Sequence, residues 1–136
     1  MPVIRHADSR RTETPIAVMT TFASPRQGGA GIAVWRVDMP AGRSGPPHAF
    51  DTEQVWTVLS GAATVELDGE TTEVGPGDTV VMPAGAPRRV HTGPCDLTAV
   101  VAAPAGGRAY ATQGVLDVPP GCAVPDGDKL VPAWTV

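Results

Sequence analysis

Three polar residues in the middle of the chain, His48, Gln54 and Arg88, have the chemistry to bind a small molecule and react with it. The imidazole of His48 can take up or release a proton near neutral pH. The guanidinium of Arg88 is permanently charged and can hold a carboxylate, an enolate or a phenolate. The amide of Gln54 can orient His48 or donate to a ligand carbonyl. We predict these three as the catalytic residues of a proton-transfer site, since no nucleophile for hydrolysis is evident.

Each of the three also has a purely structural interpretation. An isolated buried charge is too costly, so a buried Arg88 could instead pair with Asp51, Glu53 or another carboxylate at the mouth of the barrel. His48 could be inert and hydrogen-bonded to Gln54, and Gln54 could be a satisfied polar residue of the core. The sequence leaves these alternatives open.

Apolar and aromatic side chains surround these positions at strand spacing. Residues two apart share one face of a strand, so the side chains that follow Gln54 and Arg88 by two and four positions should line the same interior. An apolar, aromatic pocket with a few polar groups is the general form of a small-molecule site. Its aromatic members could equally be ordinary core residues. The predicted ligand-binding residues are Trp35, Met39, Phe50, Trp56, Val58, Val90 and Thr92.

Short strands must position these residues. Residues 32–39 alternate apolar and polar side chains, and Asp68-Gly69 between residues 63–67 and 71–74 is a strong hairpin signal. The 16 glycines and 15 prolines are spread along the chain, which indicates many turns rather than disorder. No apolar period of 3.6 residues persists, so no helix is predicted. The predicted fold class is all-β, an antiparallel sandwich or barrel.

The length of 136 residues suits a single domain. Residues 29–103 carry the regular strand pattern and should form the core of the barrel. Residues 1–28 should form an arm that adds an edge strand to this barrel or to a partner subunit. Residues 104–136 should form a coil-rich tail that caps one surface of the barrel, because they still contain Tyr110 and Trp134.

The spacing within residues 42–61 and 77–92 closely resembles the two motifs of the cupin superfamily, G-x5-H-x-H-x3-E-x6-G and G-x5-P-x-G-x2-H-x3-N. The anchor positions fall on Gly42, His48, Phe50, Gln54 and Gly61, and on Gly77, Pro83, Gly85, Arg88 and Thr92. The resemblance implies a double-stranded β-helix, which is a jelly-roll-like barrel, and a homodimer. Family activities include dioxygenases, isomerases, decarboxylases and cyclases.

The resemblance also locates the metal site of the family, and three of its four ligand positions are changed here. Only His48 keeps its imidazole. Phe50 has no donor atom, Gln54 lacks the charge of the usual glutamate, and Arg88 would repel a divalent cation. We therefore predict no metal and no other cofactor.

Two nearby residues, Glu53 and His91, are alternative metal ligands. They stand at odd offsets from Gln54 and Arg88, so strand alternation should point them outward. A β-bulge would be needed to bring either one into the barrel.

Three functions fit this pattern. The first is a metal-independent enzyme, such as an isomerase, cyclase or dehydratase, acting on a small apolar, anionic or carbonyl-bearing metabolite. The second is a non-catalytic ligand-binding or sensory barrel. The third is a metal-dependent oxygenase with a non-standard ligand set.

Bulk properties exclude other classes of function. The net charge of −4 and the lack of a basic stripe argue against a nucleic-acid partner. No apolar run is long enough to cross a membrane, and no signal peptide is apparent. Cys95 and Cys122 are far apart and form no metal motif, so we expect two reduced thiols in a cytoplasmic protein.

Overall fold

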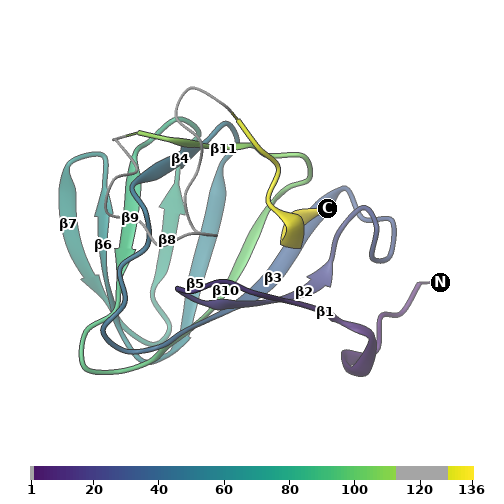
Figure 1. Ribbon diagram of the computed structural model, residues 1–136, viewed down its shortest axis with the longest axis horizontal. Helices are drawn as coiled ribbons and strands as arrows, with labels where there is room; N and C mark the ends of the chain where they lie inside the picture. The colour runs from purple at the N-terminus through teal and green to yellow at the C-terminus, as the bar shows by residue number, and fades with distance from the viewer. Residues whose placement is uncertain (1, 113–128) are drawn as a thin grey trace.

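The computed structural model describes residues 2–112 and 129–136, and these are built almost wholly of β-strands (Figure 1). Two short 3-10 turns are the only helical elements in this part of the chain. The predicted all-β class is therefore confirmed. The elements are η1 (His6–Asp8), β1 (Arg10–Glu13), β2 (Val18–Ala23), β3 (Ile32–Met39), β4 (His48–Phe50), β5 (Gln54–Ser60), β6 (Ala63–Leu67), β7 (Glu70–Val74), β8 (Thr79–Met82), β9 (Arg88–His91), β10 (Leu97–Pro104), β11 (Ala109–Ala111) and η2 (Ala133–Thr135).

The strands form two antiparallel sheets that pack face to face (Figure 1). One sheet has six strands in the order β1-β2-β3-β10-β5-β8, and the other has five in the order β11-β4-β9-β6-β7. Several strands that follow each other in the chain, such as β3 and β4 or β8 and β9, lie in different sheets. Such alternation between two sheets is typical of a jelly roll. The predicted jelly-roll-like barrel is therefore confirmed.

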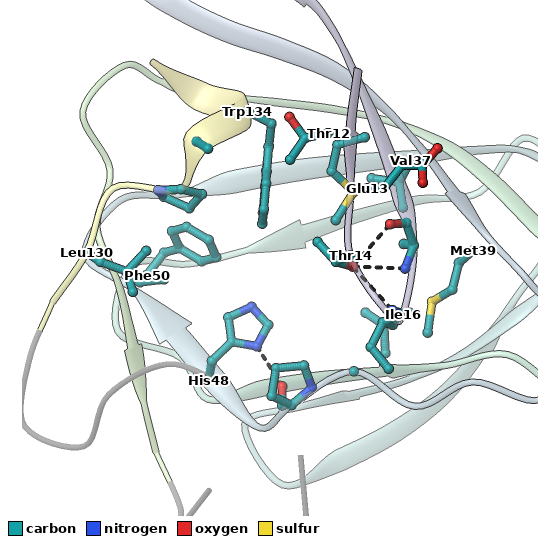
Figure 2. Close-up of a pocket in the computed structure, with 18 of the residues that line it drawn as sticks. Thr12, Glu13, Thr14, Ile16, Val37, Met39, His48, Phe50, Leu130 and Trp134 are labelled. Carbon is teal, nitrogen blue, oxygen red and sulfur yellow. Dashed lines mark hydrogen bonds between the residues drawn. The ribbon is translucent and has the colours of Figure 1, made fainter. Parts of the chain in front are cut away.

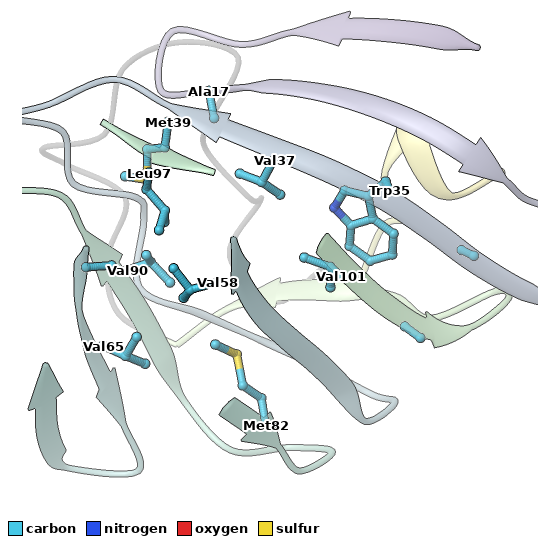
Figure 3. Packing of buried hydrophobic residues seen from close by; sticks show 13 residues of the cluster. Ala17, Trp35, Val37, Met39, Val58, Val65, Met82, Val90, Leu97 and Val101 are labelled. Atoms are coloured by element: carbon cyan, nitrogen blue, oxygen red, sulfur yellow. The ribbon is translucent and has the colours of Figure 1, made fainter. Parts of the chain in front are cut away.

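The hydrophobic core lies between the two sheets (Figure 3). Trp35, Val37 and Met39 point inward along β3 and are at most 4% exposed, as their alternation in the sequence predicts. Val65 and Val90 meet them from the five-stranded sheet. Both sheets therefore present one apolar face to the core.

Two turns show how local sequence sets the strand pairing. Asp68 and Gly69 join β6 to β7 with φ values of 50° and 84°, the left-handed conformation that a two-residue hairpin of this sequence requires. Gly61 ends β5 with φ of 78°, and a Cβ atom there would lie 1.7 Å from the Asp96 carbonyl oxygen. Only glycine fits this position without moving the backbone.

The N-terminal arm extends the six-stranded sheet of its own chain. β1 pairs with β2, and β2 pairs with β3, both in antiparallel register. The sequence left open whether the arm adds an edge strand to its own barrel or to a partner subunit. In this structure the arm adds it to its own barrel.

The last described residues, 129–136, pack against the arm and the adjoining sheet (Figure 1). The Thr21 hydroxyl donates to the Trp134 carbonyl oxygen at 2.7 Å, and the Ser24 hydroxyl donates to the Val136 oxygen at 2.7 Å. The Arg10 guanidinium donates to the same Val136 oxygen. Residues on β1 and β2 and in the turn after β2 thus hold the end of the chain in place.

Among the described residues, no helix is long and apolar enough to cross a membrane. Cys95 is an exposed free thiol, whereas Cys122 lies outside the described residues. Tyr110 lies on β11, with the Lys129 ammonium 5.0 Å from the centre of its ring.

Candidate ligand-binding site

A cavity of about 370 Å³, here called the inter-sheet cavity, opens between the two sheets beneath the arm and the tail (Figure 2). Its inner wall comes from both sheets, and its outer wall comes from residues 12–19 and 130–134. Apolar side chains dominate both walls. The lining residues are Thr12, Glu13, Thr14, Ile16, Ala17, Met19, Val37, Met39, Gly45, Pro46, His48, Phe50, Trp56, Val90, Ala109, Leu130, Pro132, Ala133 and Trp134.

His48 is the polar group placed most directly for chemistry in this cavity. Its Nδ1 lies 2.7 Å from the carbonyl oxygen of Pro46, and a carbonyl can only accept, so Nδ1 carries the proton. The other ring nitrogen, Nε2, points towards the space bordered by Phe50 and Trp134 (Figure 2). His48 therefore presents an unprotonated acceptor to anything bound there.

Burial lowers the pKa of His48 to about 4, and the positive charge of Arg88 acts in the same direction. The hydrogen bond to Pro46 opposes this shift without cancelling it. His48 is consequently neutral at pH 7.

Phe50, on β4, forms part of the same wall. Its ring meets the His48 ring edge-on, with the centroids 5.4 Å apart and an angle of 71° between the planes. The Arg88 guanidinium packs against the Phe50 ring, 5.6 Å from its centre. Phe50 thus lines the inter-sheet cavity and also contacts Arg88.

Arg88 is buried, but it does not line the inter-sheet cavity. Its guanidinium donates to the carbonyl oxygens of Pro83 at 2.9 Å and Ala86 at 3.2 Å, and approaches the Met82 sulfur at 3.6 Å. Burial lowers the pKa of Arg88 to about 10, which leaves the group charged at neutral pH. It borders a separate hollow of about 180 Å³ instead.

Neither interpretation suggested for Arg88 by the sequence describes these contacts. The guanidinium makes no ion pair with Asp51, which bonds Arg108 instead, and Glu53 is exposed. It also does not line the inter-sheet cavity, where an anion clamp would have to lie. Backbone carbonyls satisfy it, and the sequence does not reveal such partners.

Gln54 is also buried, but its hydrogen-bond partner is not His48, the partner that the sequence suggests. Its Oε1 accepts a hydrogen bond from the indole Nε1 of Trp56 at 3.1 Å. No hydrogen bond joins it to His48 among the described residues. The carbonyl of Pro46, two residues before His48 in the loop that leads into β4, orients the imidazole instead.

The predicted ligand-binding residues divide into two groups. Met39, Phe50, Trp56 and Val90 line the inter-sheet cavity. Trp35 and Val58 do not line it, because they are packed in the core, each 2% exposed. Thr92 does not line it either, because its hydroxyl donates to the Pro40 carbonyl at 2.6 Å and accepts from the Arg43 amide at 2.9 Å.

Comparison with known proteins identifies the family. Residues 35–101 match the family model of the cupin domain. The chain belongs to the cupin family. This cupin is also 33% identical over 76 residues to an uncharacterized protein of Streptomyces coelicolor, a match that covers 56% of this chain and 70% of that protein.

Solved structures of cupins resemble this one over most of its length. The polyketide cyclase RemF of Streptomyces resistomycificus is 27% identical, with a TM-score of 0.66 over 76% of this chain and 79% of the cyclase. KdgF from a Halomonas species is 25% identical, with a TM-score of 0.62 over 76% of this chain and 93% of that one. The DMSP lyase DddQ of Ruegeria pomeroyi is 23% identical, with a TM-score of 0.68, and this cupin covers 78% of its own length but only 62% of the lyase.

The side chains at the family's metal positions do not fit a divalent cation in this cupin. His48 and Arg88 face each other across β4 and β9, so a fixed positive charge stands directly beside the one remaining imidazole. Phe50 fills the next position with a hydrocarbon ring, and the Gln54 amide oxygen already accepts a hydrogen bond from Trp56. Within residues 2–112 and 129–136, no group of three His, Cys, Asp or Glu side chains is gathered.

The two alternative metal ligands lie away from the cavity, as strand alternation predicts. Glu53 is exposed. Nδ1 of His91 lies 2.7 Å from the Ser44 hydroxyl, and its Nε2 bonds the Glu66 carboxylate on the outer side of the five-stranded sheet. This bond lowers the pKa of Glu66.

The sequence does not predict the residues that form the outer wall of the cavity. Residues of the arm, including Thr12, Glu13 and Ile16, and residues of the tail, including Trp134, close the space above His48. The one sequence signal was the presence of large apolar side chains in segments with little regular pattern. Which surface these segments cover depends on pairing between residues more than 100 positions apart.

Proposed function

We propose that this cupin binds a small, largely apolar metabolite in the inter-sheet cavity, in contact with His48. One observation carries the proposal: a preformed cavity of about 370 Å³ with mostly apolar walls and a single imidazole nitrogen directed into it. Small-molecule sites commonly have this form and size.

A second candidate is a metal-independent proton-transfer enzyme of the isomerase, cyclase or dehydratase type. The fixed tautomer of His48 favours a proton-transfer enzyme, because unprotonated Nε2 can accept a proton from a bound ligand. The similarity to the polyketide cyclase RemF agrees with such chemistry. The low pKa of His48 makes it a weak base, so the geometry supports ligand binding more strongly than catalysis.

Arg88 and Gln54 would act as positioning residues in either case. Arg88 packs against the ring of Phe50, and Gln54 accepts from the indole of Trp56. Each polar residue therefore holds one aromatic wall of the inter-sheet cavity rather than the ligand. An oxygenase with a non-standard metal set is the least supported function, because the side chains at those positions do not suit a cation.

The homodimer and the cytoplasmic location expected from the sequence remain predictions. Sedimentation velocity of the full chain tests the first, since a monomer at micromolar concentration would contradict it. Fractionation of the source cells tests the second.

Filling the inter-sheet cavity tests the proposed function. Ile16 borders the cavity at the turn between β1 and β2, so Ile16→Trp should place an indole in the space that a ligand needs. We expect calorimetric binding of the uncharged probe 2-methoxynaphthalene to wild type and at least about tenfold weaker binding to this variant.

Ile32→Trp is the matched control, because Ile32 is 55% exposed and lies outside the inter-sheet cavity. It should bind the probe as wild type does. Equal binding of the probe to wild type and to Ile16→Trp would show that the cavity is not a ligand site.

A further inference from the structure

We infer that the ligand of the inter-sheet cavity is an uncharged, ring-containing molecule that donates a hydrogen bond to Nε2 of His48, as a phenol or an enol does. The inference rests on the proposed function and names the chemical class of its ligand. It differs from the anionic or carbonyl-bearing ligand that the sequence suggests.

The protonation of His48 sets the direction of the hydrogen bond. Because Nδ1–H is committed to the Pro46 carbonyl, Nε2 of the neutral ring carries only a lone pair. A ligand carbonyl or ether oxygen would place its own lone pairs against that lone pair. A ligand hydroxyl or N–H would instead complete the hydrogen bond. The low pKa of His48 agrees with this, since the ring stays neutral at pH 7 and does not become a second donor.

Anionic ligands lack a compensating charge in the cavity. Besides His48, the only ionisable lining side chain among the described residues is Glu13, a carboxylate that pairs with the exposed Arg11 at 3.3 Å. Arg88, the cation predicted to bind an anion, lies behind the cavity wall and donates to backbone carbonyls. A buried anion without a cationic or multiply hydrogen-bonding partner is strongly disfavoured.

Most other polar groups in the walls already have partners. The Thr14 hydroxyl donates to the Ala17 carbonyl at 3.1 Å and accepts from the amides of Ile16 and Ala17 (Figure 2). The Trp56 indole donates to Gln54. The Thr12 hydroxyl and the Trp134 indole can each donate one hydrogen bond, yet neither is charged. These groups leave room for a polar substituent but not for a full negative charge.

The walls favour a flat ring system. Phe50, Trp56 and Trp134 contribute aromatic surfaces to the inter-sheet cavity, and Met39 adds a polarisable thioether. His48 itself stands edge-on to Phe50, so a ring resting on Phe50 can direct a hydroxyl at Nε2. An aromatic or polycyclic alcohol combines these features.

Three probes that share one two-ring frame test the inference by calorimetry at pH 7 on the full chain. The probes are 2-naphthol, which donates a hydrogen bond, 2-methoxynaphthalene, which cannot donate, and 2-naphthoate, which is anionic. We expect 2-naphthol to bind about five- to tenfold more tightly than 2-methoxynaphthalene. We expect 2-naphthoate to bind at least about tenfold more weakly than 2-naphthol.

The variant His48→Phe removes the acceptor and keeps a ring in its place. It should lose the preference for 2-naphthol over the methoxy probe. His91→Phe is the matched control, because His91 does not line the inter-sheet cavity, and it should retain the preference.

The outcomes separate the inference from the proposed function. Equal affinities of wild type for 2-naphthol and 2-methoxynaphthalene, or tightest binding of 2-naphthoate, would overturn the inference while the cavity remains a ligand site. Failure of all three probes to bind wild type would overturn both. The affinities of wild type for the three probes test the inference even if His48→Phe does not fold.

Discussion

At the scale of single residues, backbone carbonyls account for the hydrogen bonds of His48 and Arg88, the basic side chains at two of the cupin family's metal positions. His48 and Arg88 are paired across β4 and β9, and each bonds carbonyls of a nearby proline-containing loop. For His48 this contact fixes the tautomer and leaves one nitrogen for the cavity. For Arg88 it satisfies a buried charge, and the guanidinium does not line the inter-sheet cavity.

The burial of neutral His48 should make stability depend on pH. Its pKa falls from 6.5 to about 4 on folding, so between these values the unfolded chain binds a proton that the native protein does not. The free energy of unfolding should therefore fall as the pH drops from 6.5 towards 4. His48 is only partly shielded from solvent, so we expect its contribution to be about 1 to 3 kcal/mol.

Urea unfolding at pH 7, 6 and 5 measures this dependence. His48→Gln should show a flatter decline in unfolding free energy than wild type over that range. His6→Gln, in the exposed turn η1, is the control and should follow wild type. Identical slopes for wild type and His48→Gln would mean that His48 is not buried in its neutral form.

At the scale of elements, the glycines of the cupin motifs act through two different physical effects. Gly42 and Gly61 have similar φ values of 71° and 78°. A Cβ atom at Gly42 would meet nothing within 4 Å, whereas one at Gly61 would lie 1.7 Å from the Asp96 carbonyl oxygen. At Gly42, only the left-handed backbone conformation requires glycine. At Gly61, the close approach of the Asp96 backbone is a second reason.

Alanine substitutions at these two positions should separate the two effects. Gly42→Ala should cost about 1 to 2 kcal/mol, the strain of a left-handed residue with a side chain. Gly61→Ala should cost at least about 3 kcal/mol, because the β5–β6 turn must also move away from residue 96. Chemical denaturation of both variants measures the difference. Equal losses would show that the turn after β5 shifts at little cost.

At the scale of the whole molecule, the arm and the tail complete the site that the barrel begins. The barrel contributes His48 and Phe50, while residues 12–19 and 130–134 supply the opposite wall. Hydrogen bonds from Thr21, Ser24 and Arg10 hold the tail against the arm. The two ends of the chain therefore form one wall of the inter-sheet cavity as well as extending the fold.

Trp134→Ala tests how much the packing of the tail stabilises the fold. Trp134 is half-buried and packs against the core cluster, so its loss should lower the unfolding free energy by about 1 to 3 kcal/mol. Val131→Ala, in the same segment and 37% exposed, should change it by at most about 0.5 kcal/mol. Urea denaturation compares the two. Equal effects would mean that the tail does not pack on the barrel in solution.

The sequence by itself determined the longer strands of the barrel, the hairpin at Asp68-Gly69 and the cupin fold, whereas the short strands β1, β4 and β11 had no comparable signal. Strand alternation and turn chemistry are local properties, so Trp35, Gly61 and Gly69 could be placed correctly from their neighbours in the chain. The same alternation placed His91 outside the barrel and Met39, Trp56 and Val90 on the cavity wall.

Only the tertiary structure decided which inward-facing residues reach the cavity and which partners they bind. Trp35, Gln54, Val58, Arg88 and Thr92 face inward but do not line the inter-sheet cavity. Arg88 bonds carbonyl oxygens in the turn just before β9, Gln54 bonds Trp56, and Thr92 bonds the distant Pro40 carbonyl. Strand periodicity predicts none of these partners. Because turn geometry and the packing of both chain ends decide these contacts, the strand pattern predicted the barrel but not the chemistry of its cavity.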